Sequence, residues 1–274
     1  MGYLENLFNM SGKVAIITGG SGVLGSKMAE GLLKVGVKVV ILGTNEEKLQ
    51  GKIKFLSTIS NDIMGFKCNV LEENDIKNVK EKVLNNYKHI DILINAAGGH
   101  VSGAVMGIDQ NIFDYKIKDF EKVTELNLYG TVLPTMIFGK SMAEQRSGSI
   151  INISSMATQR AITRAVGYSA AKAAIENFTR WMAVELAHKF GNNLRVNAIA
   201  PGFFLTEQNK KILKNEDGLL TERGKTIINI TPFKRFGVPE ELIGTVLWLA
   251  SDASNFVTGT IIPVDGGFNA FSGV

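Results

Sequence analysis

Short apolar runs, rich in β-branched residues, alternate with longer amphipathic segments from one end of the chain to the other. Seven of these runs predict β-strands, and they lie at residues 13–18, 37–42, 65–70, 91–95, 149–154, 195–200 and 260–264. Several are apolar on both faces, which is typical of parallel strands covered by helices on both sides. The alternation of strand and helix therefore predicts an α/β fold built on a doubly wound, parallel, seven-stranded sheet.

The segments between the strands complete this pattern and show no sign of a second domain. Residues 72–89 and 119–145 have the periodicity of helices. The chain has no internal repeat and no linker rich in Pro, Gly or Ser, so we expect a single domain over residues 1–274. Two stretches, 99–118 and 203–231, break the alternation. Because ligands bind beyond the carboxyl ends of such strands, we expect residues 203–231 to form a substrate loop or lid.

The composition narrows the class of protein further. The 274 residues carry a net charge of +4 and the 30 Lys and Arg residues are scattered, so we expect no nucleic-acid partner. The single cysteine, Cys68, excludes an internal disulfide and indicates a reducing compartment. We recognise no signal peptide and no apolar run of the roughly 18 residues that a membrane span needs, so we expect a cytoplasmic protein without a membrane partner. His89, His100 and His188 are dispersed and predict no metal site.

The first predicted strand leads directly into a glycine-rich turn, "TGGSGVLG" at residues 18–25, and a helix-like segment follows. Glycines permit the tight turn, and they let the backbone approach a pyrophosphate whose charge is held by N–H groups at the start of the helix. This strand–turn–helix context predicts a dinucleotide-binding site. The residues of the turn that we expect to contact the cofactor are Gly19, Ser21, Gly22, Val23, Leu24 and Gly25.

A second motif lies between the fifth predicted strand and the segment that follows it. Ser155 precedes Tyr168 by thirteen residues, and Lys172 follows Tyr168 by four. Of the five tyrosines, Tyr168 alone has a lysine at the fourth position beyond it. A spacing of four places both side chains on one face of a helix, one turn apart. Such a pair combines a phenol with a nearby positive charge.

Together these motifs resemble those of the short-chain dehydrogenase/reductase family over nearly the whole chain. Besides the glycine turn and Tyr-x-x-x-Lys, the resemblance is carried by "NAAG" (95–98), Asn127 in "ELNLYG", "NAIAPGF" (197–203) and "VDGGF" (264–268). It implies a Rossmann-like fold, a nicotinamide cofactor, and hydride transfer between that cofactor and a carbonyl or alcohol carbon. The protein must then manage one proton and one developing oxyanion.

The spacing of the glycines departs from the compact branch of that family. The compact branch usually carries T-G-x-x-x-G-x-G, whereas the extended branch carries T-G-x-x-G-x-x-G, which this chain matches. However, the chain is short beyond Lys172, and both "NAAG" and the late "FVTGTIIPVDGG" are typical of the compact branch. We therefore predict a compact scaffold with Val23 where that branch has a glycine.

The chemistry of hydride transfer and the resemblance together suggest a role for each residue of this centre. Tyr168 would be the general acid/base, since a Lys172 ammonium about 4 Å away favours the phenolate by roughly 4 kcal/mol at an effective dielectric near 20. That corresponds to about three pKa units and would bring the Tyr168 pKa near 7. Ser155 would bond the substrate oxygen, and the thirteen-residue spacing favours it over Ser154. By resemblance, Lys172 also holds the nicotinamide ribose, and Asn127 anchors a water that relays protons to Lys172.

The choice between NAD and NADP depends on the residues after the second predicted strand. An Asp or Glu there would select NAD, and an Arg would accept the 2′-phosphate of NADP. Gly43 and Thr44 occupy these positions, so no carboxylate repels a 2′-phosphate, and we expect NADP in preference to NAD. The resemblance extends the expected cofactor contacts beyond the glycine turn to Thr44, Asn69, Val70, Asn95, Ala96, Ala97, Tyr168, Lys172, Pro201, Gly202 and Thr206.

Candidate substrate contacts lie close to this centre in the sequence. Arg160 and Arg164 stand between the serine and the tyrosine, and an arginine there could hold a carboxylate through two hydrogen bonds. Alternatively, either arginine points to solvent or joins a subunit contact. His100, which follows "NAAGG", could face the same pocket. The polar composition of the predicted lid, including Gln208 and Asn209, suits a hydroxylated substrate better than a fatty acyl or steroid one.

Within the family, the sequence resembles the short-chain type of D-mannonate oxidoreductases, or fructuronate reductases, through "PGFFLTEQN", "NEDGLLTERG", "TPFKRFG" and "PVDGGFNAFSGV". This resemblance implies a small-molecule substrate, the reversible reduction of D-fructuronate to D-mannonate, and a homotetramer or dimer. Two alternatives stay open. The substrate could be another carbonyl compound, such as 5-keto-gluconate or a 3-oxoacyl thioester, or the chain could be a non-catalytic dinucleotide-binding module.

Overall fold

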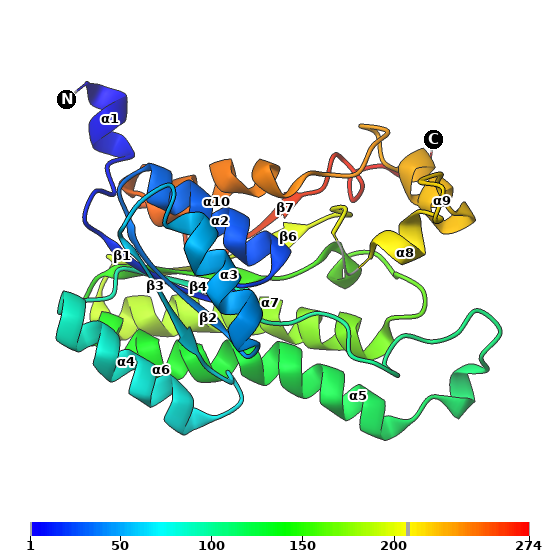
Figure 1. The fold of residues 1–274 in the computed structure, drawn as a ribbon, viewed down its shortest axis with the longest axis horizontal. Helices are drawn as coiled ribbons and strands as arrows, with labels where there is room; N and C mark the ends of the chain where they lie inside the picture. Colours follow the sequence, from blue (N-terminus) through cyan, green and yellow to red (C-terminus); the bar gives the residue numbers. More distant parts are fainter. Residues whose placement is uncertain (1, 207–208, 274) are drawn as a thin grey trace.

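The computed structural model describes residues 2–206 and 209–273 of the chain. Within these residues, seven parallel strands form one sheet in the order β3-β2-β1-β4-β5-β6-β7 (Figure 1). The strands are β1 (Val14–Thr18), β2 (Lys38–Gly43), β3 (Ile63–Lys67), β4 (Ile92–Asn95), β5 (Gly148–Ile153), β6 (Leu194–Pro201) and β7 (Ile261–Val264). The expected single-domain, Rossmann-like α/β fold is confirmed, because the strand order reverses between β1 and β4 as in a doubly wound sheet.

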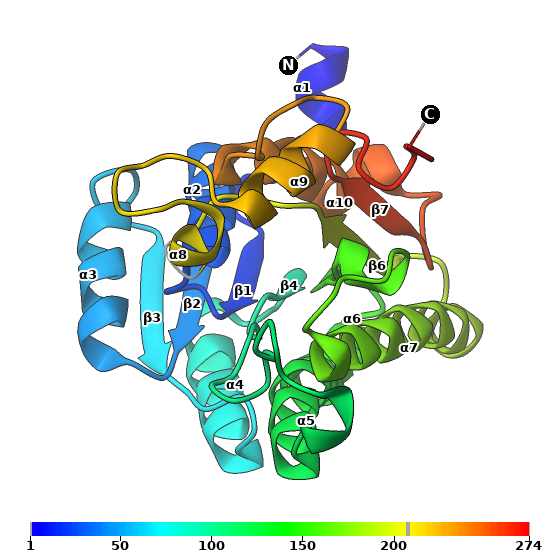
Figure 2. The ribbon, with the colours of Figure 1, turned by 90° about the vertical axis from the view of Figure 1, so that its right-hand side faces the viewer.

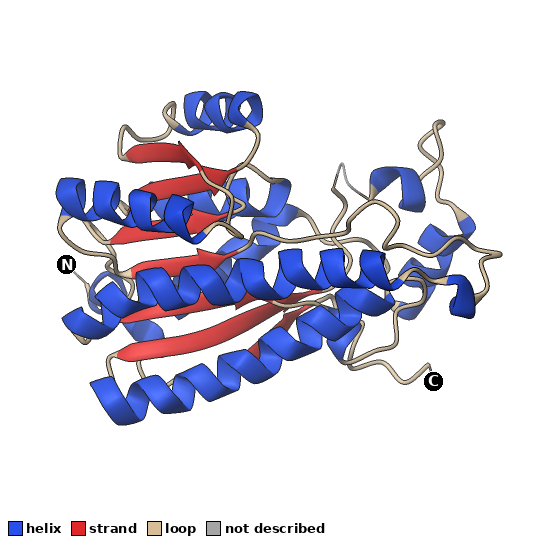
Figure 3. Ribbon diagram, turned by 90° about the horizontal axis from the view of Figure 1, so that it is seen from below, coloured by secondary structure: helices blue, strands red, loops and turns tan. Residues whose placement is uncertain are grey.

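Two layers of helices cover the sheet. One layer consists of α2 (Val23–Lys34), α3 (Glu46–Leu56) and α10 (Ile243–Ala250). The other, which faces the viewer in Figure 3, consists of α4 (Glu73–Tyr87), α5 (Ile117–Thr124), the π-helical turn η2 (Glu125–Tyr129), α6 (Gly130–Gln145) and α7 (Val166–Phe190). Side chains of each strand alternate between the layers, so that Ile17 packs with α2 and α10 and Ile16 packs with α4, α6 and α7.

Shorter elements gather mainly where the strands end. They are α1 (Tyr3–Leu7), η1 (Ile112–Asp114), η3 (Met156–Thr158), α8 (Lys210–Leu213), α9 (Glu222–Ile230), η4 (Pro239–Leu242) and η5 (Asp252–Ser254). The segments after β4, β5 and β6 extend from the same end of the sheet, on the right in Figure 1. Figure 2 looks onto this end and shows α9 beside the C-terminal tail. The stretch 203–231 thus contributes α8 and α9 to the end where a ligand is expected, and its role as a lid stays a prediction.

The third strand differs in extent from the sequence prediction. β3 covers Ile63–Lys67 rather than 65–70, because these residues pair in register with β2. Beyond them the chain turns at Asn69, whose Oδ1 accepts a hydrogen bond from the N–H of Leu71 at 3.2 Å. This local side-chain contact competes with the sheet ladder and ends the strand early.

The predicted helix 119–145 also has a more complex form. It begins at Ile117 and is interrupted by the wider turn η2, after which α6 continues to Gln145. Turns of this π type inside α-helices are frequent at functional sites. Asn127 lies in this turn and is fully buried.

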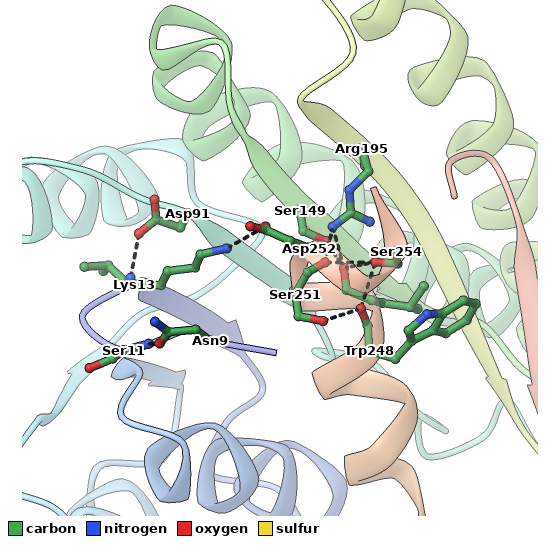
Figure 4. Close-up of polar contacts among 12 residues, drawn as sticks. Asn9, Ser11, Lys13, Asp91, Ser149, Arg195, Trp248, Ser251, Asp252 and Ser254 are labelled. Carbon is green, nitrogen blue, oxygen red and sulfur yellow. Dashed lines mark hydrogen bonds and ion pairs between the residues drawn. The ribbon is translucent and has the colours of Figure 1, made fainter. Parts of the chain in front are cut away.

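A buried arginine ties the amino ends of the strands to the last turn of α10. Arg195 of β6 is 5% exposed, and its Nη2 donates to the carbonyl oxygens of Leu249 (2.9 Å) and Ser251 (3.1 Å) (Figure 4). Ser149 of the neighbouring β5 donates its hydroxyl to the Leu249 carbonyl at 2.7 Å. These side chains satisfy carbonyl groups at the end of α10 that have no partner within the helix.

Replacing this arginine tests how much the network contributes to stability. We expect Arg195→Met to lower the free energy of unfolding by about 1–3 kcal/mol, because the carbonyl oxygens of Leu249 and Ser251 each lose one hydrogen bond at about 0.5–1.5 kcal/mol and keep the hydroxyl donors of Ser149 and Ser254. Chemical denaturation followed by tryptophan fluorescence measures the effect. As a control, Lys189→Met removes only a surface ion pair with Glu185 and should change stability by less than about 1 kcal/mol. Equal stability of Arg195→Met and the unaltered protein would contradict this role.

Candidate active site

The start of α7 and the end of β5 bring the predicted Ser155, Tyr168 and Lys172 together. α7 begins at Val166, so that Tyr168 and Lys172 lie one helical turn apart. Ser155 follows β5 and caps η3, where its Oγ accepts the N–H of Ala157 at 3.2 Å. The Ser155 hydroxyl is also hydrogen-bonded to the Tyr168 phenol. The motif therefore forms one contiguous polar cluster at the carboxyl end of the sheet.

Lys172 is a buried cation that is anchored to the end of β5. Its residue exposure is 4%, and its Nζ donates to the carbonyl oxygen of Ile153 at 2.7 Å. The same Nζ lies 5.6 Å from the centre of the Tyr168 ring. Burial lowers the pKa of Lys172 to about 8, because the charged form loses its hydration.

The expected pKa of Tyr168 was wrong in direction. Burial raises the pKa of this phenol above its ordinary value, and the hydrogen bond from Ser155 opposes the shift only in part. The charge-pair argument counted the attraction to Lys172 but not the desolvation of the phenolate, which dominates here. The phenol of Tyr168 is therefore held in its protonated form.

Asn127 holds the segment after β4 in place. Its Nδ2 donates to the carbonyl oxygens of Gly99 (2.9 Å) and Val123 (2.8 Å), and its Oδ1 accepts the N–H of Gly99 at 2.9 Å. Its own carbonyl oxygen accepts the hydroxyl of Thr131 at 3.0 Å. Both hydrogens of Nδ2 are used in these contacts, and Oδ1 keeps one lone pair, so the water relay through Asn127 stays a prediction.

A buried glutamate explains why Ser154 and Ser155 have different partners. Glu176, one turn beyond Lys172 on α7, accepts the hydroxyl of Ser154 at 2.9 Å and that of Thr158 at 2.5 Å. The Thr158 hydroxyl also lies 2.9 Å from the carbonyl oxygen of Ser155, so Glu176 and Ser155 share this donor. Ser154 is thus committed to Glu176, and Ser155 alone of the two serines is bonded to Tyr168. The sequence signal for this network is the spacing of four between Lys172 and Glu176.

Of the predicted substrate residues, His100 lies against Tyr168, whereas Arg160 is bound to the C-terminal tail. The His100 and Tyr168 rings have centroids 4.7 Å apart. The pKa of His100 is lowered by burial and by the charges of Arg223 and Lys172. Arg160 instead donates through Nε and Nη2 to the C-terminal tail.

Two further predicted candidates have other surroundings. Arg164 donates its Nε to the carbonyl oxygen of Met106, in the segment after β4. Asn209 accepts the N–H of Thr206 at 2.8 Å and donates to the carbonyl oxygen of Phe204 at 2.7 Å, so it shapes the loop after β6. Gln208 lies outside the described residues.

The glycine turn after β1 is packed tightly against backbone at two of its glycines. Gly19 has a φ of 64°, and a Cβ there would lie 2.7 Å from the carbonyl oxygen of Ala96. A Cβ at Gly25 would overlap the carbonyl oxygen of Gly19. Thr18 accepts the N–H groups of Ala96 and Ala97, both at 3.1 Å, and so fixes the turn against the segment after β4. The predicted residues Ser21, Gly22, Val23 and Leu24 complete the turn and open α2.

The residues expected to choose between NAD and NADP follow β2. Gly43 ends the strand, and a Cβ there would collide with the Ser21 hydroxyl, so a larger residue at this position would require Ser21 to rotate. Thr44 is the next residue and is exposed. Thr44 is therefore the accessible position beside the turn.

The remaining predicted cofactor residues lie at the same end of the sheet. They are Asn69 and Val70 after β3, Ala96 and Ala97 after β4, Pro201 at the end of β6, and Gly202 and Thr206 after it. Asn95 ends β4, but its side chain is 1% exposed and donates to Thr135 and Asn152, both at 2.8 Å. The Asn95 side chain bonds to α6 and to β5, so the predicted cofactor contact of Asn95 would be made by its backbone.

Comparison with known proteins identifies the family. The model of the family described as enoyl-(acyl carrier protein) reductase matches residues 21–269. The oxidoreductase UxuB of Bacillus subtilis, which is described as uncharacterized, is 46% identical over 97% of this chain and 98% of its own. The chain belongs to the short-chain dehydrogenase/reductase family. It is accordingly an NAD(P)-dependent oxidoreductase that acts on CH–OH groups.

Solved structures and further relatives of this short-chain dehydrogenase/reductase differ in substrate. A Haemophilus influenzae protein with bound NAD, described as a "putative D-Mannonate oxidoreductase", has a TM-score of 0.89 and 40% identity over 97% of this chain and 98% of that one. A gluconate 5-dehydrogenase of Burkholderia cenocepacia, in complex with NADP and tartrate, has a TM-score of 0.86 and 28% identity over 98% and 99%. The 3-oxoacyl-(acyl-carrier-protein) reductase FabG of Thermotoga maritima is 34% identical over 94% and 98%.

The described residues of this short-chain dehydrogenase/reductase contain neither a candidate membrane span nor a candidate metal cluster. No helix in residues 2–206 and 209–273 is long and apolar enough to cross a membrane. The same part of the chain has no group of three or more His, Cys, Asp or Glu side chains that could hold a metal ion.

The Glu176 network predicts a positioning role for this residue in the dehydrogenase. Glu176→Ala should lower kcat about 10- to 100-fold, because the 154–158 turn loses two buried acceptor contacts and small misplacements of reacting groups are costly. The KM for the dinucleotide should stay within about twofold. Glu176→Gln keeps an acceptor oxygen of the same shape and should restore most of the activity, as steady-state kinetics can measure. Equal loss in both variants, or no loss in Glu176→Ala, would contradict a positioning role.

The pKa values of the centre also predict a pH profile. Lys172 keeps its charge below about pH 8 and loses it as the pH rises through that value. Because the pKa of Tyr168 is raised, the phenol stays protonated over the same range. We therefore expect kcat/KM for carbonyl reduction to fall above about pH 8, with Lys172 as the group responsible. A flat profile from pH 7 to 9.5, with the fold intact by circular dichroism, would exclude this assignment.

Proposed function

We propose that this dehydrogenase interconverts a keto and a hydroxy sugar acid, with D-fructuronate and D-mannonate as the substrate pair. The similarity to the Haemophilus influenzae structure, over nearly the full length of both chains, is the observation that carries the proposal. The Burkholderia cenocepacia gluconate 5-dehydrogenase, which was crystallised with the hydroxy acid tartrate, supports the same substrate class.

We infer the following roles for the residues at the centre. The Ser155 hydroxyl donates a hydrogen bond to the carbonyl oxygen of the substrate and polarises it. Tyr168 donates its phenolic proton to the oxygen as negative charge develops there, and its raised pKa favours this direction. Lys172 stabilises the resulting phenolate, and Asn127 orients the Gly99 backbone beside it. When bound, the dinucleotide supplies the hydride and, in its oxidised form, a positive charge beside the phenol.

We further propose that the glycine turn and the strand ends hold the dinucleotide. Gly19 and Gly25 keep the turn tight, because a Cβ at either would meet the protein's own backbone, and a tight turn supports close approach of the backbone to a phosphate. Tyr168, Lys172 and Thr206 face the nicotinamide half, and Thr44, Asn69 and Val70 face the adenosine half. The preference for NADP stays a prediction that rests on the missing carboxylate at positions 43 and 44.

The assembly and location belong to the same proposal. We infer a homodimer or homotetramer in the cytoplasm that acts on a small molecule. Exposed apolar side chains on the outer face of the second helix layer support subunit association, among them Tyr129 (53%), Met136 (50%), Trp181 (55%) and Val184 (54%).

A 3-oxoacyl thioester reductase is the second candidate. The 34% identity to the Thermotoga maritima enzyme favours it. Against it, the predicted lid has polar residues such as Asn209 and Arg223. A short hydroxylated acid suits these surroundings better than an acyl chain.

A substrate screen tests this proposal. We expect NAD(P)H oxidation with D-fructuronate to exceed that with 5-keto-gluconate or a 3-oxoacyl thioester, with NADH and NADPH measured in parallel. Tyr168→Phe should lower kcat by about 10²- to 10⁴-fold, the usual range for a lost general acid, with NAD(P)H binding retained. The exposed Tyr129→Phe serves as control and should keep full activity. Preference for the thioester would refute the substrate, and full activity of Tyr168→Phe would refute the general acid.

A further inference from the structure

A cavity lies beside the catalytic cluster, at the end of the sheet where the loops gather. Its volume is about 530 Å³, within the range of small-molecule sites. It is bounded by residues 160–163 after β5, by α9 and by the C-terminal tail (Figure 2). Much of its wall is apolar, with Ile162, Phe203, Ile227 and Phe268 among the lining residues. Such a wall strengthens any charge interaction inside the cavity.

Arg223 brings positive charge to this apolar wall. It lies in the first turn of α9 and is half-buried. Its Nη1 donates to the Thr163 hydroxyl at 3.1 Å and its Nη2 to the Thr163 carbonyl oxygen at 3.4 Å. A guanidinium has five N–H groups, so Nε and one N–H on each terminal nitrogen remain. No carboxylate of the described residues contributes to the electrostatics of Arg223.

The charge of Arg223 acts on His100, which lies against Tyr168 of the catalytic cluster. The His100 ring lies against Tyr168, and its pKa is lowered by burial and by the charges of Arg223 and Lys172. Burial and the charge of Arg164 likewise lower the pKa of Arg223. At neutral pH the His100 imidazole is therefore neutral, and the two arginines and Lys172 carry the positive charge. Repulsion among these cations is relieved when an anion binds between them.

Arg160 is closer to Ser155 in the sequence but is already occupied. Its Nε donates to the carbonyl oxygen of Asn269 at 3.1 Å, and its Nη2 donates to those of Asn269 and Phe271. The edge that a carboxylate needs for two parallel hydrogen bonds is therefore taken by the C-terminal tail. Arg160 builds the wall of the cavity, and Arg223 keeps donors for a ligand.

We propose that Arg223 binds the carboxylate of the substrate and thereby gives the enzyme its preference for acids over uncharged carbonyl compounds. The proposal rests on the proposed function, since it names the residue that recognises the acid group of a keto sugar acid. The His100 ring lies against Tyr168, with ring centroids 4.7 Å apart, and Arg223 is near enough for its charge to act on His100. The planar guanidinium can pair two N–H groups with the two carboxylate oxygens, which a lysine cannot.

Kinetics with a charged and an uncharged substrate test this assignment. The probes are D-fructuronate and its methyl ester, which differ only in the carboxylate. We expect Arg223→Gln to lower kcat/KM for the acid about 100-fold, mainly through KM, and to change that for the ester by less than threefold. Arg223→Lys should recover part of the loss, because it restores charge without the paired hydrogen bonds. Lys225→Gln, the matched control from the same helix, removes an exposed ion pair with Glu222 and should keep the preference for the acid.

Two results would overturn the proposal. Equal losses for acid and ester in Arg223→Gln would mean that the arginine supports the fold of α9 through Thr163. An unchanged preference for the acid would mean that another group binds the carboxylate.

A binding measurement separates this proposal from the proposed function. If the unaltered enzyme reduces neither D-fructuronate nor its ester, the proposed substrate is wrong, and titration calorimetry with D-gluconate in the presence of NADH then tests Arg223 directly. Binding that weakens at least tenfold in Arg223→Gln, but not in Lys225→Gln, supports a carboxylate site at Arg223. Equal binding in both variants, or no binding to the unaltered enzyme, overturns it.

Discussion

The candidate active site depends on a lysine ammonium that is buried beside a phenol. An isolated buried cation is costly by several kcal/mol, and Lys172 has one protein acceptor, the carbonyl oxygen of Ile153 at 2.7 Å, to offset that cost. The lowered pKa of Lys172 reflects the part of the cost that this hydrogen bond does not offset. The contact joins α7 to the end of β5, and the residues after Ile153 are the two serines. The interaction that holds the ammonium therefore also fixes the distance between Ser155 and Tyr168.

Burial favours the neutral forms of both Tyr168 and Lys172. It raises the pKa of Tyr168 and lowers that of Lys172, so the cluster favours a protonated phenol. A protonated phenol is what carbonyl reduction needs at its start, whereas alcohol oxidation needs the phenolate. The two directions thus place different demands on the same residues, and oxidation depends more strongly on additional positive charge near the ring. The hydrogen bond from Ser155 works toward that second state, because it stabilises negative charge on the phenolic oxygen.

The sequence predicted the features that local pattern controls. The seven strands follow from apolar runs, and the placement of Tyr168 one turn from Lys172 follows from the helical period; all of these are found, although the third strand lies at Ile63–Lys67 rather than at 65–70. Contacts between distant segments were not predictable in this way. Arg160 binds the carbonyl oxygen of Phe271, more than a hundred residues away, and nothing in its neighbourhood in the sequence signals that contact. The sign of the Tyr168 pKa shift was missed for a related reason, since an argument from charge alone contains no information on burial.

Steric contacts in the glycine turn explain why a glycine spacing typical of the extended branch occurs in a compact scaffold. Both patterns of the family place glycines at the positions of Gly19 and Gly25 and differ only at 22 and 23. In the structure, Gly19 and Gly25 are the positions where a Cβ would meet backbone atoms most severely. Gly22 caps α2, and Val23 begins it with a half-buried side chain, so a Cβ at 23 is accommodated. The turn thus requires the glycines that the two branches share, while the position of the middle glycine can vary without a steric clash.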